Sequence, residues 1–100
     1  MQYTTVKISE IKHPMKNFQV MGKIENKKGR TDSLRRHYTA YMHDETGKVM
    51  INLWRNQIDQ VNDGDTIYLL GAFTQKGKRG MTVSTWEEKI FKERPKIFGM

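Results

Sequence analysis

Five short runs of alternating apolar and polar residues set the tightest limit on how this chain folds. A pattern that repeats every two residues is typical of a β-strand with one buried face. Segments rich in Gly, Asn, Asp and Lys separate the runs and favour turns and loops. We therefore expect β-strands over residues 18–25, 37–43, 48–54, 66–73 and 81–85.

A short helix is expected between the third and fourth runs. Ile58 and Val61 lie three residues apart, which is a helical spacing, and the turn-forming sequence NDGD follows at 62–65. Residues 3–13 can hold one further helical turn. The sequence DETG at 44–47 is typical of a hairpin turn between the second and third strands.

The order strand, strand, strand, short helix, strand, strand is that of a five-stranded Greek-key barrel, the OB fold. An SH3-like barrel is the nearest alternative, but it has no helix between its third and fourth strands. Gly22 marks a bend or bulge in the first strand. We expect an all-β OB domain over residues 1–86, followed by a basic tail over residues 87–100.

The charge of the chain favours a polyanionic partner. The formal net charge is +7 at pH 7 and the isoelectric point is near 9.8, which favours nucleic acid over a membrane surface. The chain has no cysteines, so neither a disulfide framework nor a thiol-rich zinc site is expected. No apolar run approaches the ~20 residues of a membrane span, and the first residues lack the apolar core of a signal peptide. We expect a cytoplasmic, nucleoid-associated protein.

Three segments resemble a known family. IKHPMKNFQVMGKIE at 11–25, DETGKVMINLW at 44–54 and VNDGDTIYLLGAF at 61–73 are similar to the OB domains of archaeal-type single-stranded DNA-binding proteins and replication protein A. The similarity spans roughly residues 6–84. The resemblance implies an OB fold that binds single-stranded DNA without strong sequence preference, in DNA replication, recombination or repair.

The outward faces of the second and third strands predict a surface for single-stranded nucleic acid. Such surfaces combine a basic groove with aromatic side chains on which bases stack. Alternation places Tyr41 and Trp54 on one outward face, together with Lys48 and Asn52. We expect Trp54 to stack on a base, as the resemblance also implies, although a tryptophan here can instead cover the end of the barrel or pack on the tail. Tyr41 can either stack on a base or pack against the protein, and the sequence favours neither role.

Phe73 is placed differently by the pattern and by the resemblance. Strict alternation puts Phe73 in the core with Ile67 and Leu69, whereas the resemblance puts a base-stacking aromatic residue at this position. The alternation and the resemblance agree if a bulge at Gly71 or Ala72 reverses which side of the strand Phe73 faces. Resembling proteins often carry another aromatic residue in the loop before the fifth strand, and TQKGKRG here has none. We expect charge to replace stacking there, which makes binding more salt-sensitive.

Two loops that are expected to flank this face are rich in basic residues. Residues 23–36 contain six bases and two acids, and residues 76–79 contain three bases and no acid. We expect these side chains to contact phosphates, the alternative being that they are only solvated. Arg55, directly after Trp54, either contacts a phosphate or caps the short helix. The predicted phosphate contacts in the loops are Lys23, Lys27, Lys28, Arg30, Arg36, Lys76, Lys78 and Arg79.

No pattern in the sequence predicts catalysis. His37 and His43 lie about 20 Å apart on an extended strand, too far for one metal ion, and there are no cysteines to join them. The sequence has no glycine-rich phosphate loop followed by a helix and no nucleophile elbow. We expect no enzyme activity, no cofactor and no bound metal.

Two alternative functions stay open. The first is an adapter subunit that binds a protein partner through apolar residues of the C-terminal segment, Trp86, Ile90 and Phe91 among them, although these residues can instead fold back over the barrel. The second is binding of single-stranded RNA, because aromatic platforms and lysines do not separate RNA from DNA. No membrane contact is expected.

Overall fold

The computed structural model describes residues 3–29, 37–77, 80–86 and 89–92. The long strands are β2 (Lys16–Gly29), β3 (His37–Asp44), β4 (Gly47–Trp54), β5 (Thr66–Gly77) and β6 (Gly80–Ser84). Two-residue strands, β1 (Thr4–Thr5) and β7 (Ile90–Phe91), lie at the two ends of the described chain. The described helices are the 3-10 turn η1 (Ile8–Glu10) and the helix α1 (Asn56–Gln60). Among these residues no helix is long and apolar enough to cross a membrane.

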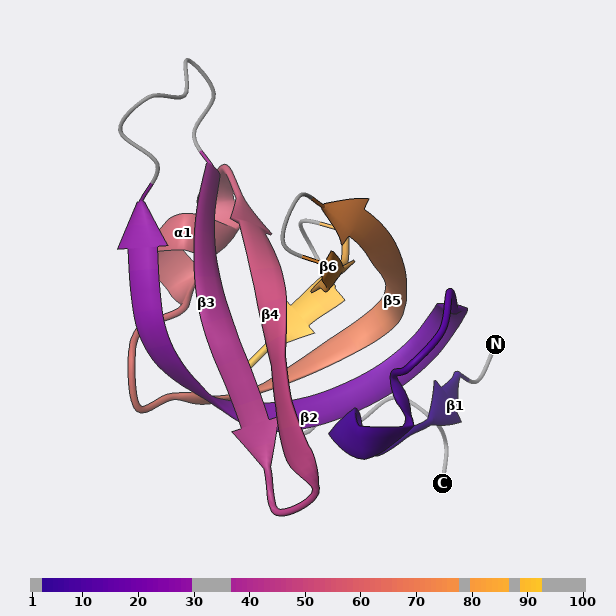
Figure 1. The fold of residues 1–100 in the computed structure, drawn as a ribbon. Helices are drawn as coiled ribbons and strands as arrows, with labels where there is room; N and C mark the ends of the chain where they lie inside the picture. The colour runs from indigo at the N-terminus through magenta and orange to yellow at the C-terminus, as the bar shows by residue number, and fades with distance from the viewer. Residues whose placement is uncertain (1–2, 30–36, 78–79, 87–88, 93–100) are drawn as a thin grey trace.

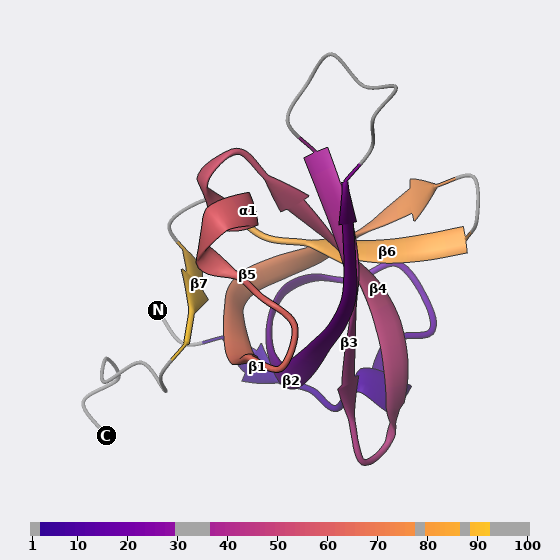
Figure 2. The same ribbon diagram turned by 90° about the vertical axis from the view of Figure 1, so that its left-hand side faces the viewer.

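The strands form one sheet that closes on itself (Figures 1 and 2). Their order is β1-β2-β3-β4-β6-β5-β7, and β2 also pairs with β5, which joins the two edges formed by the long strands. The helix α1 follows β4, at the position that the sequence predicts. This closed five-stranded arrangement confirms the predicted OB fold.

β2 closes the barrel by changing its partner along its length. Its first half, from Lys16 to Lys23, pairs with β5, and its second half, from Lys23 to Gly29, pairs with β3. Gly22, where the sequence predicts a bend, lies at this change of partner. A Cβ atom at Gly22 would lie 2.4 Å from Met42 Cγ, so the absence of a side chain lets β2 and β3 approach closely.

The inward parity of the strands builds the core, as alternation predicts. Burying each large aliphatic or aromatic side chain contributes about 1.5–3 kcal/mol. The large apolar side chains of this parity that are most deeply buried are Phe18, Val20, Ile24, Met42, Ile51, Leu53, Ile67, Leu69 and Val83. β2 and β5 continue past the predicted ends at residues 25 and 73, to Gly29 and Gly77, through polar residues that have no buried face. Hydrophobic alternation therefore stops before the strands do.

The two short strands were not predicted. β1 pairs in parallel with β2, and β7 pairs with β5 through Tyr68 opposite Phe91 and Leu69 opposite Ile90. Ile90 also packs against the core. Part of the segment that the sequence assigns to a tail therefore adds a strand to the sheet, beside β5 in Figure 2. Two residues are too few to leave a periodic signal.

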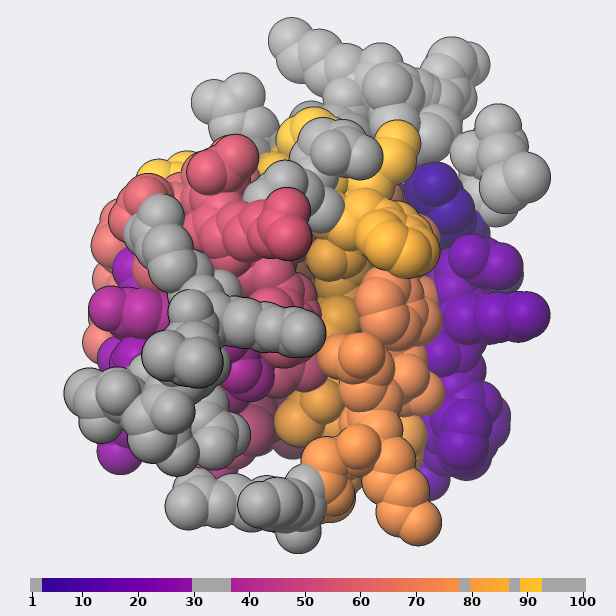
Figure 3. Space-filling model, turned by 90° about the horizontal axis from the view of Figure 1, so that it is seen from above, coloured from indigo at the N-terminus to yellow at the C-terminus, as the bar shows by residue number. Residues whose placement is uncertain are grey.

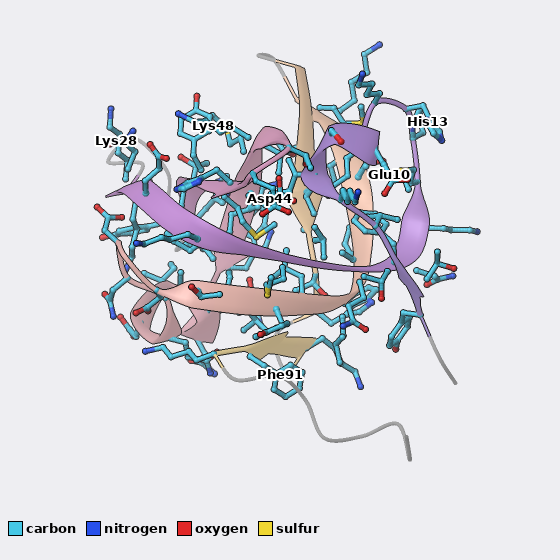
Figure 4. The ribbon with its side chains drawn as sticks, turned by 90° about the horizontal axis from the view of Figure 1, so that it is seen from below. Glu10, His13, Lys28, Asp44, Lys48 and Phe91 are labelled. Atoms are coloured by element: carbon cyan, nitrogen blue, oxygen red, sulfur yellow. The ribbon has the colours of Figure 1, made fainter. Side chains whose placement is uncertain are left out.

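Asp44 fixes the β3–β4 hairpin to η1. Its carboxylate accepts hydrogen bonds from the backbone N–H groups of Thr46 (2.7 Å), Gly47 (3.1 Å) and Ile8 (3.1 Å) and from the Thr46 hydroxyl. Burial acts to raise the pKa of Asp44, but these hydrogen bonds outweigh it and hold that pKa below its ordinary value. The ionised side chain is thus part of the fold, near the centre of Figure 4.

Candidate nucleic-acid interface

The strand register gathers the predicted site residues of β3 and β4 on one outer face. Directly opposed residues of an antiparallel pair share a side of the sheet. His37 lies opposite Trp54, Thr39 opposite Asn52, Tyr41 opposite Met50 and His43 opposite Lys48. The outward parity predicted for Tyr41, Lys48, Asn52 and Trp54 is therefore present in the structure. β6 extends this face because Thr82 lies beside Met50.

Trp54 is half-buried, and one side of its ring is already stacked. The His37 imidazole lies parallel to it, with 4.0 Å between ring centroids and 10° between planes. His37 Nε2 is 3.0 Å from Asn52 Oδ1, which fixes the imidazole in this orientation. His37 was not predicted as a site residue, although it shares the parity of Tyr41. The pair shows that the Trp54 ring already supports face-to-face stacking of a flat heterocycle.

Asn52 lies at the centre of a polar network below this surface. Its side-chain amide donates to Thr82 Oγ1 (2.8 Å), Ser84 Oγ (2.9 Å) and Gln75 Oε1 (3.3 Å). The side chain has the outward parity that alternation predicts, but the residue is only 9% exposed. Both ends of the Asn52 amide are occupied within the protein, so we assign Asn52 the support of the surface in place of the predicted direct contact.

Thr82, Ser84 and Gln75 are members of the outer face that the sequence analysis missed. Thr82 and Ser84 are the polar parity of the fifth run, MTVST, and that alternation was the available signal. Ser84 lies opposite Phe73, and Thr82 lies opposite Gln75, across the β5–β6 ladder. The outer face therefore runs from β4 across β6 to β5 without interruption.

The ammonium group of Lys48 lies over the Tyr41 ring. Lys48 Nζ is 5.4 Å from the Tyr41 ring centroid and 3.4 Å from Glu25 Oε2, and His43 Nε2 is 3.3 Å from Glu25 Oε1. Glu25 offsets part of the positive charge here. Exposed ion pairs of this kind are worth only about 0–1 kcal/mol, so Lys48 can exchange Glu25 for a phosphate at little cost.

A bulge in β2 places neighbouring lysines on different sides. Between Glu25, opposite Tyr41, and Lys28, opposite Thr39, β2 has one residue more than β3. Asn26 takes the left-handed backbone conformation, with φ of 55°. Lys28 therefore faces outward with Tyr41, as does Lys23, which lies opposite His43. Figure 4 shows Lys28 and Lys48 along the same side of the barrel, away from Phe91.

Lys27 is turned the other way by the same bulge. Its ammonium donates to the Ile58 carbonyl of α1 and lies 5.6 Å from the centroid of the Tyr38 ring, which packs against the core. Its backbone N–H donates to Asp63 Oδ1 at 2.9 Å. Lys27 was predicted as a phosphate contact, but in the structure it ties the end of β2 to α1, so we assign it a structural role.

Phe73 reaches the outer surface through a register shift in β5. From Val20 to Phe18, β2 advances by two residues, while β5 advances by three, from Leu69 to Ala72. Gly71 in this bulge has φ of 62°, a conformation that favours glycine. Ala72 is buried and Phe73 is half-buried, so the alternation reverses as the sequence hypothesis required.

Trp86, which the sequence placed at the domain boundary, lies beside Phe73. The ring centroids are 5.5 Å apart and the planes are inclined at 45°. The two rings line an open groove of about 640 Å³ whose other lining residues include Met15, Lys16 and Thr74. In Figure 3 the orange atoms of β5 border both the yellow segment above them and the purple segment of β2 on the right.

The remaining predicted residues lie at the margin of this face or outside the described residues. Arg55 is exposed at the start of α1, with φ of 49°, and its side chain makes no hydrogen bond that caps the helix. Lys76 is exposed and lies opposite Met81, so it has the parity opposite to Gln75. Within the described residues, no group of three or more His, Cys, Asp or Glu side chains is arranged to hold a metal ion. The predicted contacts Arg30, Arg36, Lys78 and Arg79 lie outside the described residues.

No protein-family model matches the chain, and no curated protein matches it in sequence. Solved structures do match its fold. An OB domain from Thermoplasma acidophilum has a TM-score of 0.72 and 19% identity, over 95% of this chain and 92% of its own. The second OB-fold domain of replication protein A from Methanococcus maripaludis has a TM-score of 0.68 and 20% identity, over 92% and 98%. A murine DNA-binding protein bound to double-stranded DNA has a TM-score of 0.65 and 20% identity, over 95% and 52%. These likenesses show a shared OB fold.

Proposed function

We propose that this protein binds single-stranded DNA on the outer face of β3, β4, β6 and β5, without strong sequence preference and without catalysis. Bases stack on Trp54 and Phe73, with Tyr41 as a further platform. Lys23, Lys28 and Lys48 contact phosphates beside them. A role in coating exposed strands during replication, recombination or repair follows from this mode of binding.

The observation that carries the proposal is that the side chains on one outer face of the sheet include Trp54, Tyr41, Lys23 and Lys28. Two bulges are needed to produce the face, since one in β2 turns Lys28 outward and one in β5 turns Phe73 outward. Aromatic faces beside lysines match a single strand, because every base has a π-face and every nucleotide a phosphate. The bound DNA of the murine neighbour supports a nucleic-acid partner and makes the duplex the first alternative to exclude.

A duplex should bind much more weakly than a single strand. Its base faces are covered by neighbouring pairs, and exposing one costs a few kcal/mol. The lysines still contact duplex phosphates, so weak, salt-sensitive binding remains. Losing two stacked bases at ~1–3 kcal/mol each leaves the duplex roughly 30-fold or more weaker.

The test is a side-by-side titration by fluorescence anisotropy. The ligands are a labelled thymine-rich strand, a blunt duplex of equal length and the matching uridine-rich RNA, all at about 0.1 M salt. Tight binding of the single strand alone supports the proposal, and the RNA arm measures the preference between sugars. Equal affinity for strand and duplex would show that the aromatic residues are not platforms. Weak binding to all three would favour the adapter function instead.

A further inference from the structure

The groove beside Phe73 contains the most exposed tryptophan of the described chain. Trp86 is 62% exposed, although tryptophan is normally well buried. Phe73 supports the ring from one side at a centroid distance of 5.5 Å. The side chain contributes little to the core, so its exposure points to a ligand.

The walls of the groove are fixed before any ligand binds. Met15 N–H donates to Thr74 Oγ1 at 2.9 Å, and Thr74 N–H donates to the Met15 carbonyl at 2.9 Å. These bonds hold the segment before β2 against β5. The groove volume of about 640 Å³ lies within the ~300–1,000 Å³ of small-ligand sites, so one nucleotide fits.

A buried glutamine connects this groove to Trp54. Gln57 in α1 is fully buried, and its Oε1 accepts from Trp54 N–H at 3.0 Å. Its Nε2 donates to the carbonyls of Thr85 and Trp86, each at 3.0 Å. One side chain therefore fixes the backbone of both tryptophans. The polar floor of Asn52 and Ser84 leads from Trp54 to Phe73, because Ser84 lies opposite Phe73 on β5.

We propose that the Phe73–Trp86 groove is a further nucleotide subsite, in which a base stacks on Trp86 and its phosphate contacts Lys16. This inference rests on the proposed function and extends the path of the strand from Trp54 across β6 to the start of β2. Among the described residues that line the groove, Lys16 is the single charged one, and its sign suits a phosphate. Continuity with the Trp54 face selects a nucleic-acid strand over a protein segment as the occupant.

The chain has two tryptophans, so each can report alone. Trp54→Phe keeps an aromatic platform and leaves Trp86 as the fluorophore, and Trp86→Phe leaves Trp54. Each variant is titrated with a twelve-nucleotide thymidine strand while a fluorescent label on the strand reports total binding by anisotropy. We expect quenching of both tryptophans, with midpoints that agree with the anisotropy curve.

Affinity is then compared across substitutions. Trp86→Ala should weaken binding about 5- to 150-fold, the range for one stacked base. Lys16→Gln should weaken it about 5-fold at 0.1 M salt, the share of one phosphate contact to a single strand. The matched control is Phe91→Ala, which removes a half-buried aromatic ring from β7 outside the groove and should leave affinity unchanged. Far-ultraviolet circular dichroism and a melting curve check that each variant is folded.

The outcomes separate this inference from the proposed function. If the strand quenches Trp54 but leaves the fluorescence of Trp86 unchanged at saturation, the subsite is overturned while the proposed function stands. A folded Trp86→Ala variant with wild-type affinity would do the same. A strand that quenches neither tryptophan and shows no anisotropy change would overturn the proposed function itself.

Discussion

Lys27 and Lys28 are adjacent in the chain, yet we expect their substitution by Gln to have opposite consequences. The β2 bulge turns Lys28 toward the face of Tyr41 and Lys27 toward α1. Lys28→Gln removes one phosphate contact, so the slope of log affinity against log salt should become less steep by about 0.7. Over the tenfold range from 1 M to 0.1 M salt, this corresponds to about 0.7 log units, or a 5-fold loss of affinity at 0.1 M.

Lys27→Gln should leave the salt slope unchanged and reduce stability instead. The substitution removes a charge-assisted hydrogen bond to the Ile58 carbonyl and a cation–π contact with Tyr38. These contacts together are worth about 1–2 kcal/mol at a partly buried site. The change should appear as a lower urea midpoint with an unchanged m-value.

The assay is a titration of each variant with the labelled thymidine strand at five salt concentrations, together with urea unfolding of the free protein. The two variants have the same change in charge, so they control for the general effect of net charge on affinity. Equal slope changes in both variants would refute the assignment of the two lysines to different sides. An unchanged slope in Lys28→Gln would remove this residue from the phosphate path.

Three further outcomes follow from the structure. Trp54→Ala should weaken single-strand binding by ~1–3 kcal/mol in a folded protein while Trp54→Phe keeps most of the affinity, as anisotropy titration will measure. Asn52→Leu should lower the free energy of unfolding by ~1–3 kcal/mol, because the buried Ser84 hydroxyl and the partly buried His37 Nε2 lose their hydrogen bonds to Asn52. Unchanged stability in urea would contradict the network. The pKa of Asp44 is lower in the folded state, so the ionised side chain stabilises the fold above the unfolded pKa near 3.8. This stabilisation is lost as the pH falls through the folded-state pKa. Melting curves between pH 7 and pH 2 should therefore show a weaker acid dependence for Asp44→Asn than for the wild type.

The strand positions and most of their faces were predictable because apolar residues alternate with polar ones along most of each strand. Val20, Ile51 and Leu69 have the inward parity that alternation assigns to them, and Trp54 has the outward one. The parity of Lys27 and Lys28 was not predictable, because a bulge is a local backbone choice at Asn26 that no period in the sequence records. At Phe73 the resemblance indicated the outward position, and the bulge at Gly71 is the physical reason for it.

The composition of the groove was less accessible to sequence analysis. Trp86 lies outside every alternating run, and its position beside Phe73 depends on the path of the chain after β6. The charged loop TQKGKRG suggested that lysines replace a missing aromatic residue. That expectation stays a prediction, and in the structure the aromatic ring of Trp86 also approaches the end of β5 from another segment. Ser84 lies opposite Phe73 in the β5–β6 hairpin, so Trp86, two residues further on, reaches Phe73 only through the path of the chain after β6, which alternation does not encode.

Two buried side-chain amides, those of Asn52 and Gln57, hold the outer face in place by hydrogen bonds, as apolar packing holds the core. Asn52 holds His37, Thr82 and Ser84, and Gln57 holds the backbone of Trp54 and Trp86. Among the described residues, no buried side-chain polar atom lacks a hydrogen-bond partner. A fully satisfied network restrains its members, so little conformational entropy remains to be lost when a ligand binds. The aromatic rings that we propose as platforms are therefore held in place in the free protein, and we expect substitutions at Asn52 or Gln57 to weaken binding although neither side chain contacts a base.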